Sequence, residues 1–424
     1  MLAPRQDAES ALVKSILVIG GGIIGTASAL ALRAAGFDVI LIDCGDPRRG
    51  ASFGNAGHIG AEQCDPWPSA YNLLHFPQHL FAWGGPLDFR VTDVARWIPW
   101  SMRFVAAAVP ANVRRGQRGM ELLLKEPIAA WQRLFALAGI PPMVTPCGHY
   151  VVWMSAQEAT HYRGLWQRAD TGTARYRDLS NAELARVSGA LRTSPVDGIA
   201  FTGTGQLSQP QEVRDRLTEA FGARGGERVA ADVTSISVDG SGVQVESSEG
   251  KKYRAEEALI AAGAWSGPLM RQLGVRAPLI AERGYHLHSR THAWPAELPP
   301  VVFEARSVIV TRFTDGLRMT SFLEFGDPDA PADPRKWKRL AQHIDELGIE
   351  FSREPDRWMG PRPTLPDYLP AIGRLKSHPK VMYAFGHQHL GMTLAAVTAE
   401  WIERIATGNA PPADLEFYRI ERFG

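Results

Sequence analysis

The sequence predicts an α/β protein in which a Rossmann-like dinucleotide-binding domain is interrupted twice by a β-rich α+β domain. A glycine-rich turn at Gly20 to Gly25 follows an apolar strand and opens a helix. The same alternation of strands and helices returns twice later in the chain. The two stretches that separate these three segments differ from them in composition. We expect a discontinuous nucleotide domain formed by residues 15–64, 207–268 and 355–415. The insertions at 65–206 and 269–354 then form a substrate domain.

The glycine-rich turn is the strongest local signal. Residues 16–19 read Ile-Leu-Val-Ile, which is typical of a buried parallel strand, and residues 26–35 are alanine-rich and helical in pattern. Gly20, Gly22 and Gly25 occupy the three glycine positions of a GxGxxG turn. Such glycines allow a tight turn, an approach of backbone to a pyrophosphate, and close packing of helix on strand. The start of the helix adds free N–H groups and a positive dipole end.

An acidic residue completes the nucleotide fingerprint. The second apolar strand, residues 39–42, ends at Asp43, which is suited to bind a ribose hydroxyl. Strand, turn, helix, strand and acid together favour a dinucleotide site over an incidental glycine turn. The fingerprint alone does not separate FAD from NAD.

The remaining elements follow from periodicity and turn residues. Helices are expected at residues 114–139, in short pieces within 156–192, and at 211–223, 335–348 and 393–406. Strands are expected at residues 149–154, 233–238, 243–247, 258–261, 283–289, 301–312, 317–324 and 381–384. The second and third of these strands flank Asp-Gly-Ser-Gly at 239–242, which predicts a hairpin.

Composition narrows the class of protein. The 424 residues suggest two or three domains, and a net charge of +1 without a long basic tract argues against a nucleic-acid partner. Three widely spaced cysteines, Cys44, Cys64 and Cys147, indicate neither a disulfide framework nor a zinc site. The first fourteen residues contain no apolar core of a signal peptide, and no uncharged stretch is long enough to span a bilayer. These features favour a cytoplasmic location.

Seven short segments in colinear order carry a family resemblance. They are GGGIIG (20–25), SFGNAGHIG (52–60), ALIAAGAWS (258–266), ERGYHL (282–287), VTRFTDGLRMT (310–320), GPRPTLPDYLPAIG (360–373) and FGHQHLGMT (385–393). Together they resemble the FAD-dependent D-amino-acid oxidase superfamily, and within it most closely the bacterial D-amino-acid dehydrogenase small subunit. The resemblance runs from about residue 15 to residue 415, and it implies that the domain binds FAD in the manner of D-amino-acid oxidase.

The resemblance implies a set of FAD-binding residues. They are Gly20, Gly22, Ile23, Ile24, Gly25, Asp43, Cys44, Ser52, Asn55, Ala56, Gly57, His58, Val233, Ala262, Gly263, Trp265, Arg362, Gly386, His387, His389, Leu390, Gly391, Met392 and Thr393. By position, Asp43 holds the adenosine ribose, and the turn into Thr393 directs backbone N–H groups at the flavin. Plainer interpretations stay open: Asn55 stabilises its own turn, Gly263 ends a strand, and the turn at 386–393 is an ordinary helix start.

The resemblance segments contain no cysteine that could attach the flavin covalently. The Phe385 to Thr393 turn contains none, so we expect non-covalent FAD, with His58 and His387 as the alternative attachment points. His387 and His389 lack nearby acids at metal-ligand spacing, and we expect no metal.

Three residues are candidates for contact with the substrate. Arg362, between Pro361 and Pro363, matches the arginine that anchors the substrate carboxylate in members of the superfamily, where a planar fork suits two oxygens. The alternative for Arg362 is a structural salt bridge. Tyr285 is expected to donate to the carboxylate or close the pocket, with a core tyrosine as the alternative. His58 is expected to hold substrate or orient water, with a structural histidine as the alternative.

The resemblance implies a reaction. A D-amino acid, including a cyclic one such as D-proline or 4-hydroxy-D-proline, gives hydride from its α carbon to flavin N5, and the electrons pass to a quinone or other respiratory acceptor. The alternatives are an oxygen-using oxidase of the glycine or sarcosine oxidase type, a flavin-bearing subunit of a heteromeric dehydrogenase, and an NAD-dependent dehydrogenase. A strand and helix typical of the nucleotide domain return at 381–406, and this argues against an NAD-dependent dehydrogenase.

Residues 90–115 allow two interpretations. Arginines alternate there with Trp97, Ile98, Trp100, Met102 and Phe104, as in an interfacial helix on the inner face of a bacterial membrane. The favoured interpretation is a helix packed on the substrate domain.

Overall fold

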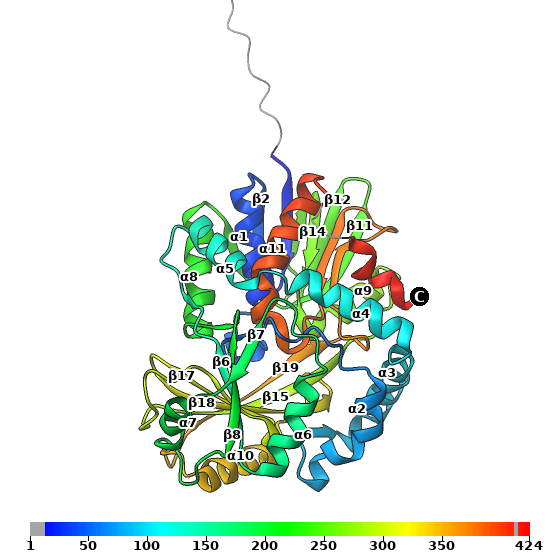
Figure 1. Ribbon diagram of the computed structural model, residues 1–424. Helices are drawn as coiled ribbons and strands as arrows, with labels where there is room; N and C mark the ends of the chain where they lie inside the picture. Colours follow the sequence, from blue (N-terminus) through cyan, green and yellow to red (C-terminus); the bar gives the residue numbers. More distant parts are fainter. Residues whose placement is uncertain (1–12, 411–413) are drawn as a thin grey trace, which may run out of the picture.

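Two large sheets organise the molecule, one in the upper and one in the lower part of Figure 1. The computed structural model describes residues 13–410 and 414–424. The predicted absence of a signal peptide concerns residues that lie almost entirely outside these ranges. The mixed α/β class predicted from the sequence is confirmed.

The first sheet has six strands in the order β10-β2-β1-β14-β21-β20. These are β10 (Glu227–Ala230), β2 (Asp38–Asp43), β1 (Ser15–Ile19), β14 (Glu257–Ile260), β21 (Val381–Phe385) and β20 (Ala371–Arg374). All pair in parallel except β20, which is antiparallel to β21. Because side chains alternate along a strand, Ile16 and Val18 of β1 face one core while Leu17 and Ile19 face another.

Each face of this sheet has its own cover. Four helices lie on the Ile16 side: α1 (Ile23–Ala34), α5 (Pro127–Ala138), α8 (Pro210–Ala223) and α11 (Gly391–Thr407). The Leu17 side is covered by the antiparallel strands β11 (Val233–Asp239), β12 (Gly242–Ser247) and β13 (Lys252–Ala255) and by α9 (Ser266–Gln272). The carboxyl ends of β1, β2 and β14 point toward the second sheet (Figure 1).

The second sheet has nine strands. In order they are β19 (Asp356–Thr364), β15 (Ile280–Ser289), β18 (Gly316–Gly326), β17 (Val308–Phe313), β16 (Val301–Phe303), β6 (His149–Trp153), β8 (Asp197–Thr202) and β7 (Arg175–Asp178), with β4 (Leu87–Phe89) beside β18. Helix α10 (Pro334–Leu347) packs on one face, where Leu340 and Ile344 join the core that contains Tyr285 and Leu287.

Strand β18 changes partner along its length. It pairs with β17 up to Thr320 and with β4 from Leu323 onward. Phe322, between the two, has φ 72°, a conformation that costs energy for a bulky residue. The kink turns the strand at the edge of a cavity that Phe322 lines.

A small sheet joins distant loops. Strand β9 (Gly205–Leu207) pairs with both β3 (His58–Ile59) and β5 (Val144–Thr145). This pairing fixes the loop after β2 against the start of β6, so that His58 meets His149.

Three predicted elements need correction. The single helix expected over 114–139 is two helices, α4 (Pro110–Leu123) and α5, because Pro127 lacks the N–H that would continue α4 and instead starts α5. The strand expected over 301–312 is two strands, separated by a turn at Glu304–Arg306. The short helices expected within 156–192 are α6 (Ala156–Trp166) and α7 (Asn181–Ser188), but strand β7 lies between them.

The first part of the predicted insertion at 65–206 is mostly helical. It contains α2 (Ala70–His75) and α3 (Val94–Ala107), which run down the right side of Figure 1 beside the second sheet. Within the described residues, no helix has the length and apolar character needed to cross a bilayer.

The predicted domain limits stay a prediction. The three nucleotide segments contribute all strands of the six-stranded sheet. Strand β19, however, pairs with β15 in the nine-stranded sheet, although residue 355 was the predicted start of the third nucleotide segment.

Candidate cofactor and substrate site

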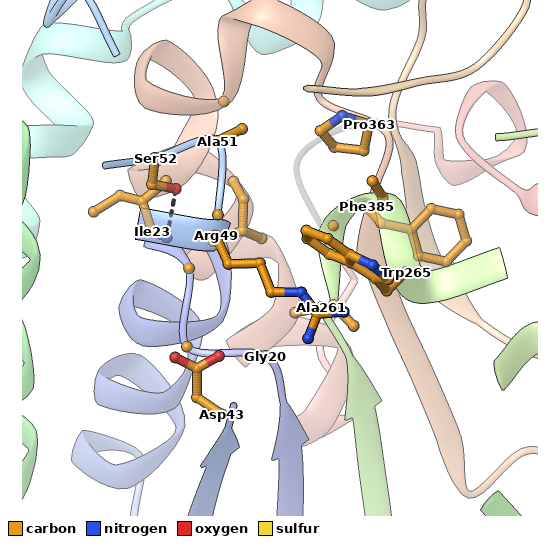
Figure 2. Close-up of a pocket in the computed structure, with 18 of the residues that line it drawn as sticks. Gly20, Ile23, Asp43, Arg49, Ala51, Ser52, Ala261, Trp265, Pro363 and Phe385 are labelled. Atoms are coloured by element: carbon orange, nitrogen blue, oxygen red, sulfur yellow. Dashed lines mark hydrogen bonds between the residues drawn. The ribbon is translucent and has the colours of Figure 1, made fainter. Parts of the chain in front are cut away.

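A first cavity lies where the parallel strands end. It is lined by the glycine turn after β1, by Asp43 at the end of β2 and by Ala261 to Trp265 after β14 (Figure 2). Gly20 has φ 108°, and a Cβ there would lie 2.5 Å from the carbonyl oxygen of Ala261. A Cβ on Gly25 would collide with the carbonyl oxygen of Gly20, so this glycine lets the helix approach the strand.

Gly22 is the open position of the turn. The nearest atom to a Cβ built on it is Ser52 Oγ at 3.5 Å, so the space in front of Gly22 is left to the cavity. Gly22 is the N-cap residue of α1 and has no side chain that could cap the helix. The hydroxyl of Ser52 accepts a hydrogen bond from the N–H of Ile23 at 3.1 Å (Figure 2). These features fit a pyrophosphate at a helix N-terminus.

Arg49 is a cavity residue that the sequence analysis missed. Its guanidinium lies 4.4 Å from the Trp265 ring centre and crosses the cavity between the Gly20 turn and Trp265 (Figure 2). Asp232 and Asp329 pair with it at 3.3 and 3.2 Å. A cation so placed suits the phosphates or the adenine ring of a dinucleotide. The sequence signal for this residue was the pair Arg48-Arg49 shortly after Asp43, the acid that ends β2.

A second, larger cavity of about 1190 Å³ lies between the nine-stranded sheet and helices α2 and α3. Its walls are rich in aromatic side chains, among them Trp67, Tyr71, Trp100, Phe322 and Tyr368. Ala51, Asn55 and Arg362 line both cavities, so the two meet at these residues. A dinucleotide in the first cavity would therefore present its reactive end to the second.

The predicted cofactor residues divide between the two cavities. The first is lined by Gly20, Gly22, Ile23, Ile24, Asp43, Cys44, Ser52, Asn55, Val233, Ala262, Gly263, Trp265, Arg362, His387, Gly391 and Met392. The second is lined by Asn55, Ala56, His58, Arg362, His389, Leu390 and Thr393. Gly25, Gly57 and Gly386 line neither cavity and shape the turns behind them.

Two predicted residues have structural partners that explain their place. Asn55 Oδ1 accepts from the N–H of Gly57 at 2.8 Å, so this side chain does stabilise its own turn while it lines both cavities. His387 is buried, its Nε2 bonds Thr398 Oγ1 at 2.9 Å, and burial lowers its pKa to about 3.

The start of α11 is tied to the loop that carries His58. Thr393 Oγ1 accepts from the N–H of Gly60 at 3.1 Å. No side chain caps the helix at Leu390, so its first N–H groups are available to a ligand. This end of α11 borders both cavities through Met392 and Thr393, as expected for the flavin end of an FAD.

Arg362 is held in place at the junction of the cavities. Its Nη1 donates to Glu282 Oε1 at 3.2 Å and to the carbonyl oxygen of Phe322 at 3.0 Å. A Cβ on Gly284 would collide with the guanidinium, so a side chain there would displace Arg362 from this position. The ion pair that was the alternative interpretation is present, and the guanidinium lines both cavities as well.

The structure does not bring Tyr285 to either cavity. The side chain is fully buried, and its hydroxyl donates to Glu324 at 2.5 Å and accepts from the N–H of Asp333 at 3.0 Å. Burial raises the pKa of this phenol. Strand alternation directs Tyr285 to the α10 side of β15, which is the core position that was the alternative interpretation.

A polar cluster missed by the sequence analysis surrounds His58. His58 Nε2 lies 3.4 Å from Glu62 Oε1, and the ring centres of His58 and His149 lie 4.5 Å apart. His149 is anchored by Thr204 Oγ1 at 2.9 Å, and His389 bonds Gln63. One nitrogen or oxygen atom each from His58, Glu62 and His149 lies within 4.8 Å of the others. The i, i+4 spacing of His58 and Glu62 was visible in the sequence, but the approach of His149 was not.

The groups of this cluster differ in their ionisation. Burial opposes ionisation of Glu62, but His149 and His58 outweigh it and lower the pKa of Glu62 to about 2. Burial lowers the pKa of both His149 and His389 to about 3. At neutral pH the cluster therefore contains a carboxylate beside two neutral imidazoles.

The glycine turn and the cavity at the ends of the parallel strands define a dinucleotide-binding protein with a second cavity beside that site. Residues 15–405 match the DAO family, described as FAD dependent oxidoreductase, and the chain belongs to this family. Its cofactor is FAD, and it is an oxidoreductase. The nucleotide left open by the glycine fingerprint is thus settled by the family.

Relatives of nearly the same length support the family. A D-amino-acid oxidase of Bradyrhizobium diazoefficiens is 26% identical over 421 residues, covering 97% of this chain and 99% of the relative. A D-amino acid dehydrogenase of Dechloromonas aromatica is 27% identical, covering 95% of this chain and 99% of the relative. Among solved structures, iminodiacetate oxidase from Chelativorans sp. BNC1 has a TM-score of 0.70 at 17% identity, covering 95% and 98% of the two chains. The last likeness confirms the predicted fold.

Proposed function

We propose that this protein oxidises a D-amino acid at its α carbon, with a substrate carboxylate bound by Arg362. The observation that carries the proposal is the position of Arg362, a cation where the two cavities meet. We call the first of them, at the glycine turn, the FAD cavity, and the second the aromatic cavity. The names of the two relatives, D-amino-acid oxidase and D-amino acid dehydrogenase, support the substrate class.

The side chains of the cavity divide the work of binding. The Arg362 fork takes the carboxylate, and the Glu282 and Phe322 contacts hold the fork in one orientation. The aromatic walls exclude water and enclose the substrate side chain. When bound, FAD supplies the hydride acceptor that the chain itself lacks. The product of a linear substrate is an imine that hydrolyses to a 2-oxo acid and ammonia.

The test is anaerobic bleaching of the flavin by a panel of D-amino acids with their L-enantiomers as controls. The panel includes D-proline and 4-hydroxy-D-proline, because we propose that the substrate class extends to cyclic secondary amines. Bleaching by D- but not L-enantiomers is the expected result. A protein that no D-amino acid bleaches would have another substrate, and bleaching by linear members alone would remove the cyclic class.

The proposed electron acceptor is a quinone reached at a membrane surface. Of fifteen exposed large hydrophobic side chains in the described residues, eleven lie between Trp67 and Val109. On α3 the exposed Val94, Ile98, Met102 and Val105 form one stripe at helical spacing. The opposite side of α3 packs into the core through Trp100, so the helix is both packed, as favoured from the sequence, and apolar outside.

Flotation with anionic vesicles tests this surface. We expect Met102→Ser with Val105→Ser to reduce binding several-fold, since each substitution removes apolar area from the interface. Val196→Ser, another exposed valine far along the chain, is the matched control and should float like the parent. Equal flotation of all three proteins would argue against the surface. Peroxide formation as fast as dye reduction would favour the oxygen-using alternative.

A further inference from the structure

One carboxylate in the aromatic cavity has an oxygen without a partner. Glu62 is only 5% exposed. Its Oε1 lies 3.4 Å from His58 Nε2 and accepts from Gln63 Nε2 at 3.3 Å. Its Oε2 is buried and accepts no hydrogen bond from any described residue. A buried carboxylate with a free oxygen costs stability unless a cation meets it.

His149 and His389 supply no positive charge to this carboxylate at neutral pH. The titratable groups around Glu62 are His58, His149 and His389, and burial keeps the pKa of both His149 and His389 low. The nearest permanent positive charge of the cavity is Arg362, and Glu282 already pairs with it. The cluster is therefore built for a positive group that enters from outside.

Glu62 and Arg362 both lie near His389. The positive charge of Arg362 and the negative charge of Glu62 shift the pKa of this imidazole in opposite directions, so both lie within electrostatic reach of it. Both residues also line the same cavity. An amino acid carries the complementary pair, a carboxylate and an ammonium group on one carbon atom. The charge pattern of the cavity therefore matches the zwitterion.

We propose that Glu62 binds the α-ammonium group of the substrate while Arg362 binds its carboxylate. The proposal rests on the proposed function and adds the residue that recognises the amine. The free Oε2 accepts an N–H of the ammonium group, which donates up to three hydrogen bonds. Glu62 thereby distinguishes an amino acid from a 2-hydroxy acid of the same shape.

The same geometry gives His58 a role. An ammonium nitrogen has no lone pair to assist departure of the α hydrogen, so it must lose a proton first. The imidazole of His58 takes that proton: the N–H bond of the substrate breaks, an N–H bond on His58 forms, and the lone pair stays on the substrate nitrogen. Glu62 then faces an imidazolium in place of the ammonium group, so its charge stays paired throughout.

The experiment compares the holoenzyme with Glu62→Gln and with Glu304→Gln. Glu304 lines the same cavity, but both of its oxygens already accept from the indoles of Trp153 and Trp166. The dissociation constant comes from the rate of anaerobic flavin reduction at rising concentrations of the fastest D-amino acid. The competing ligand is the 2-hydroxy acid with the same side chain, measured as an inhibitor. Flavin content and circular dichroism verify folding.

Glu62→Gln should raise the dissociation constant of the amino acid roughly 10–100-fold, the effect of losing a charged hydrogen bond. The inhibition constant of the 2-hydroxy acid should change less than about 3-fold, since that ligand has no ammonium group to lose a charged partner. Glu62→Asp should keep part of the affinity, and Glu304→Gln should bind both ligands like the parent. His58→Asn should leave the dissociation constant unchanged and slow flavin reduction, with recovery at alkaline pH where the free amine predominates.

Two outcomes of the variant comparison would overturn the assignment of Glu62. One is that Glu62→Gln binds the amino acid as tightly as the parent, and the other is that it weakens both ligands equally. A stoichiometric divalent metal in the purified holoenzyme would also overturn it, because the metal would then be the cation of this cluster. A parent protein that no D-amino acid binds or reduces would refute the proposed function, and the assignment with it.

Discussion

The two cavities differ in how their walls are assembled from the chain. The FAD cavity is built around a turn of six consecutive residues and the ends of adjacent parallel strands. The aromatic cavity takes its walls from α2 and α3, from β6, from the turn after β16 and from the start of α11. Backbone geometry defines the first, and distant side chains define the second. Local sequence therefore specifies a dinucleotide-binding site, while the shape of the second cavity depends on tertiary contacts.

The largest effect is expected from a change in the backbone-built cavity. Gly22→Asp should abolish FAD retention, because the new carboxylate would occupy the open space before the helix and repel a pyrophosphate. The measurement is the ratio of flavin to protein after purification. Gly240→Asp, in the hairpin turn where a Cβ meets no atom within 4 Å, is the control and should keep its flavin. A Gly22→Asp protein with full flavin content would remove the pyrophosphate from this turn.

The same contrast explains what the sequence could predict. The glycine turn, Asp43 and the hairpin at 233–247 depend on local spacing, and all are found where predicted. Glu62 and His149 lie 87 residues apart, and only the pairing of β3, β9 and β5 brings their neighbourhoods together. The motif containing Tyr285 was recognised, but its side-chain direction depends on which face of β15 meets α10. No local pattern determines that face.

A smaller effect is expected at the junction of the two cavities. Arg362→Met should retain FAD but lose on the order of 10²-fold in catalytic efficiency, since a severed charge pair with one buried partner costs about 2–5 kcal/mol. Arg362→Lys should recover part of it, because lysine supplies charge without the planar fork. Flavin reduction at several substrate concentrations measures both.

The structure adds a control for this substitution. Arg362→Met also leaves Glu282 buried without its ion pair, although Thr364 and Tyr368 still donate to Glu282. The double variant Arg362→Met with Glu282→Gln removes the unpaired charge, so it should regain stability without regaining activity. Recovery of activity in the double variant would show that Arg362 acts only through Glu282.

The smallest effect is expected at Glu304, in the wall of the aromatic cavity. Burial raises the pKa of Glu304 to about 7, although hydrogen bonds from Trp153 and Trp166 oppose the shift. An acid with a raised folded pKa loses stability as pH rises from its unfolded value of 4.5 to its folded value, and the loss is complete above it. Glu304→Gln resembles the protonated acid, so it should match the parent near pH 4 and be more stable at pH 8 by about 3 kcal/mol. Denaturant titrations at the two pH values measure the difference. An equal difference at both would mean that Glu304 stays ionised in the fold, and the wall of the aromatic cavity would then carry a permanent negative charge at this residue.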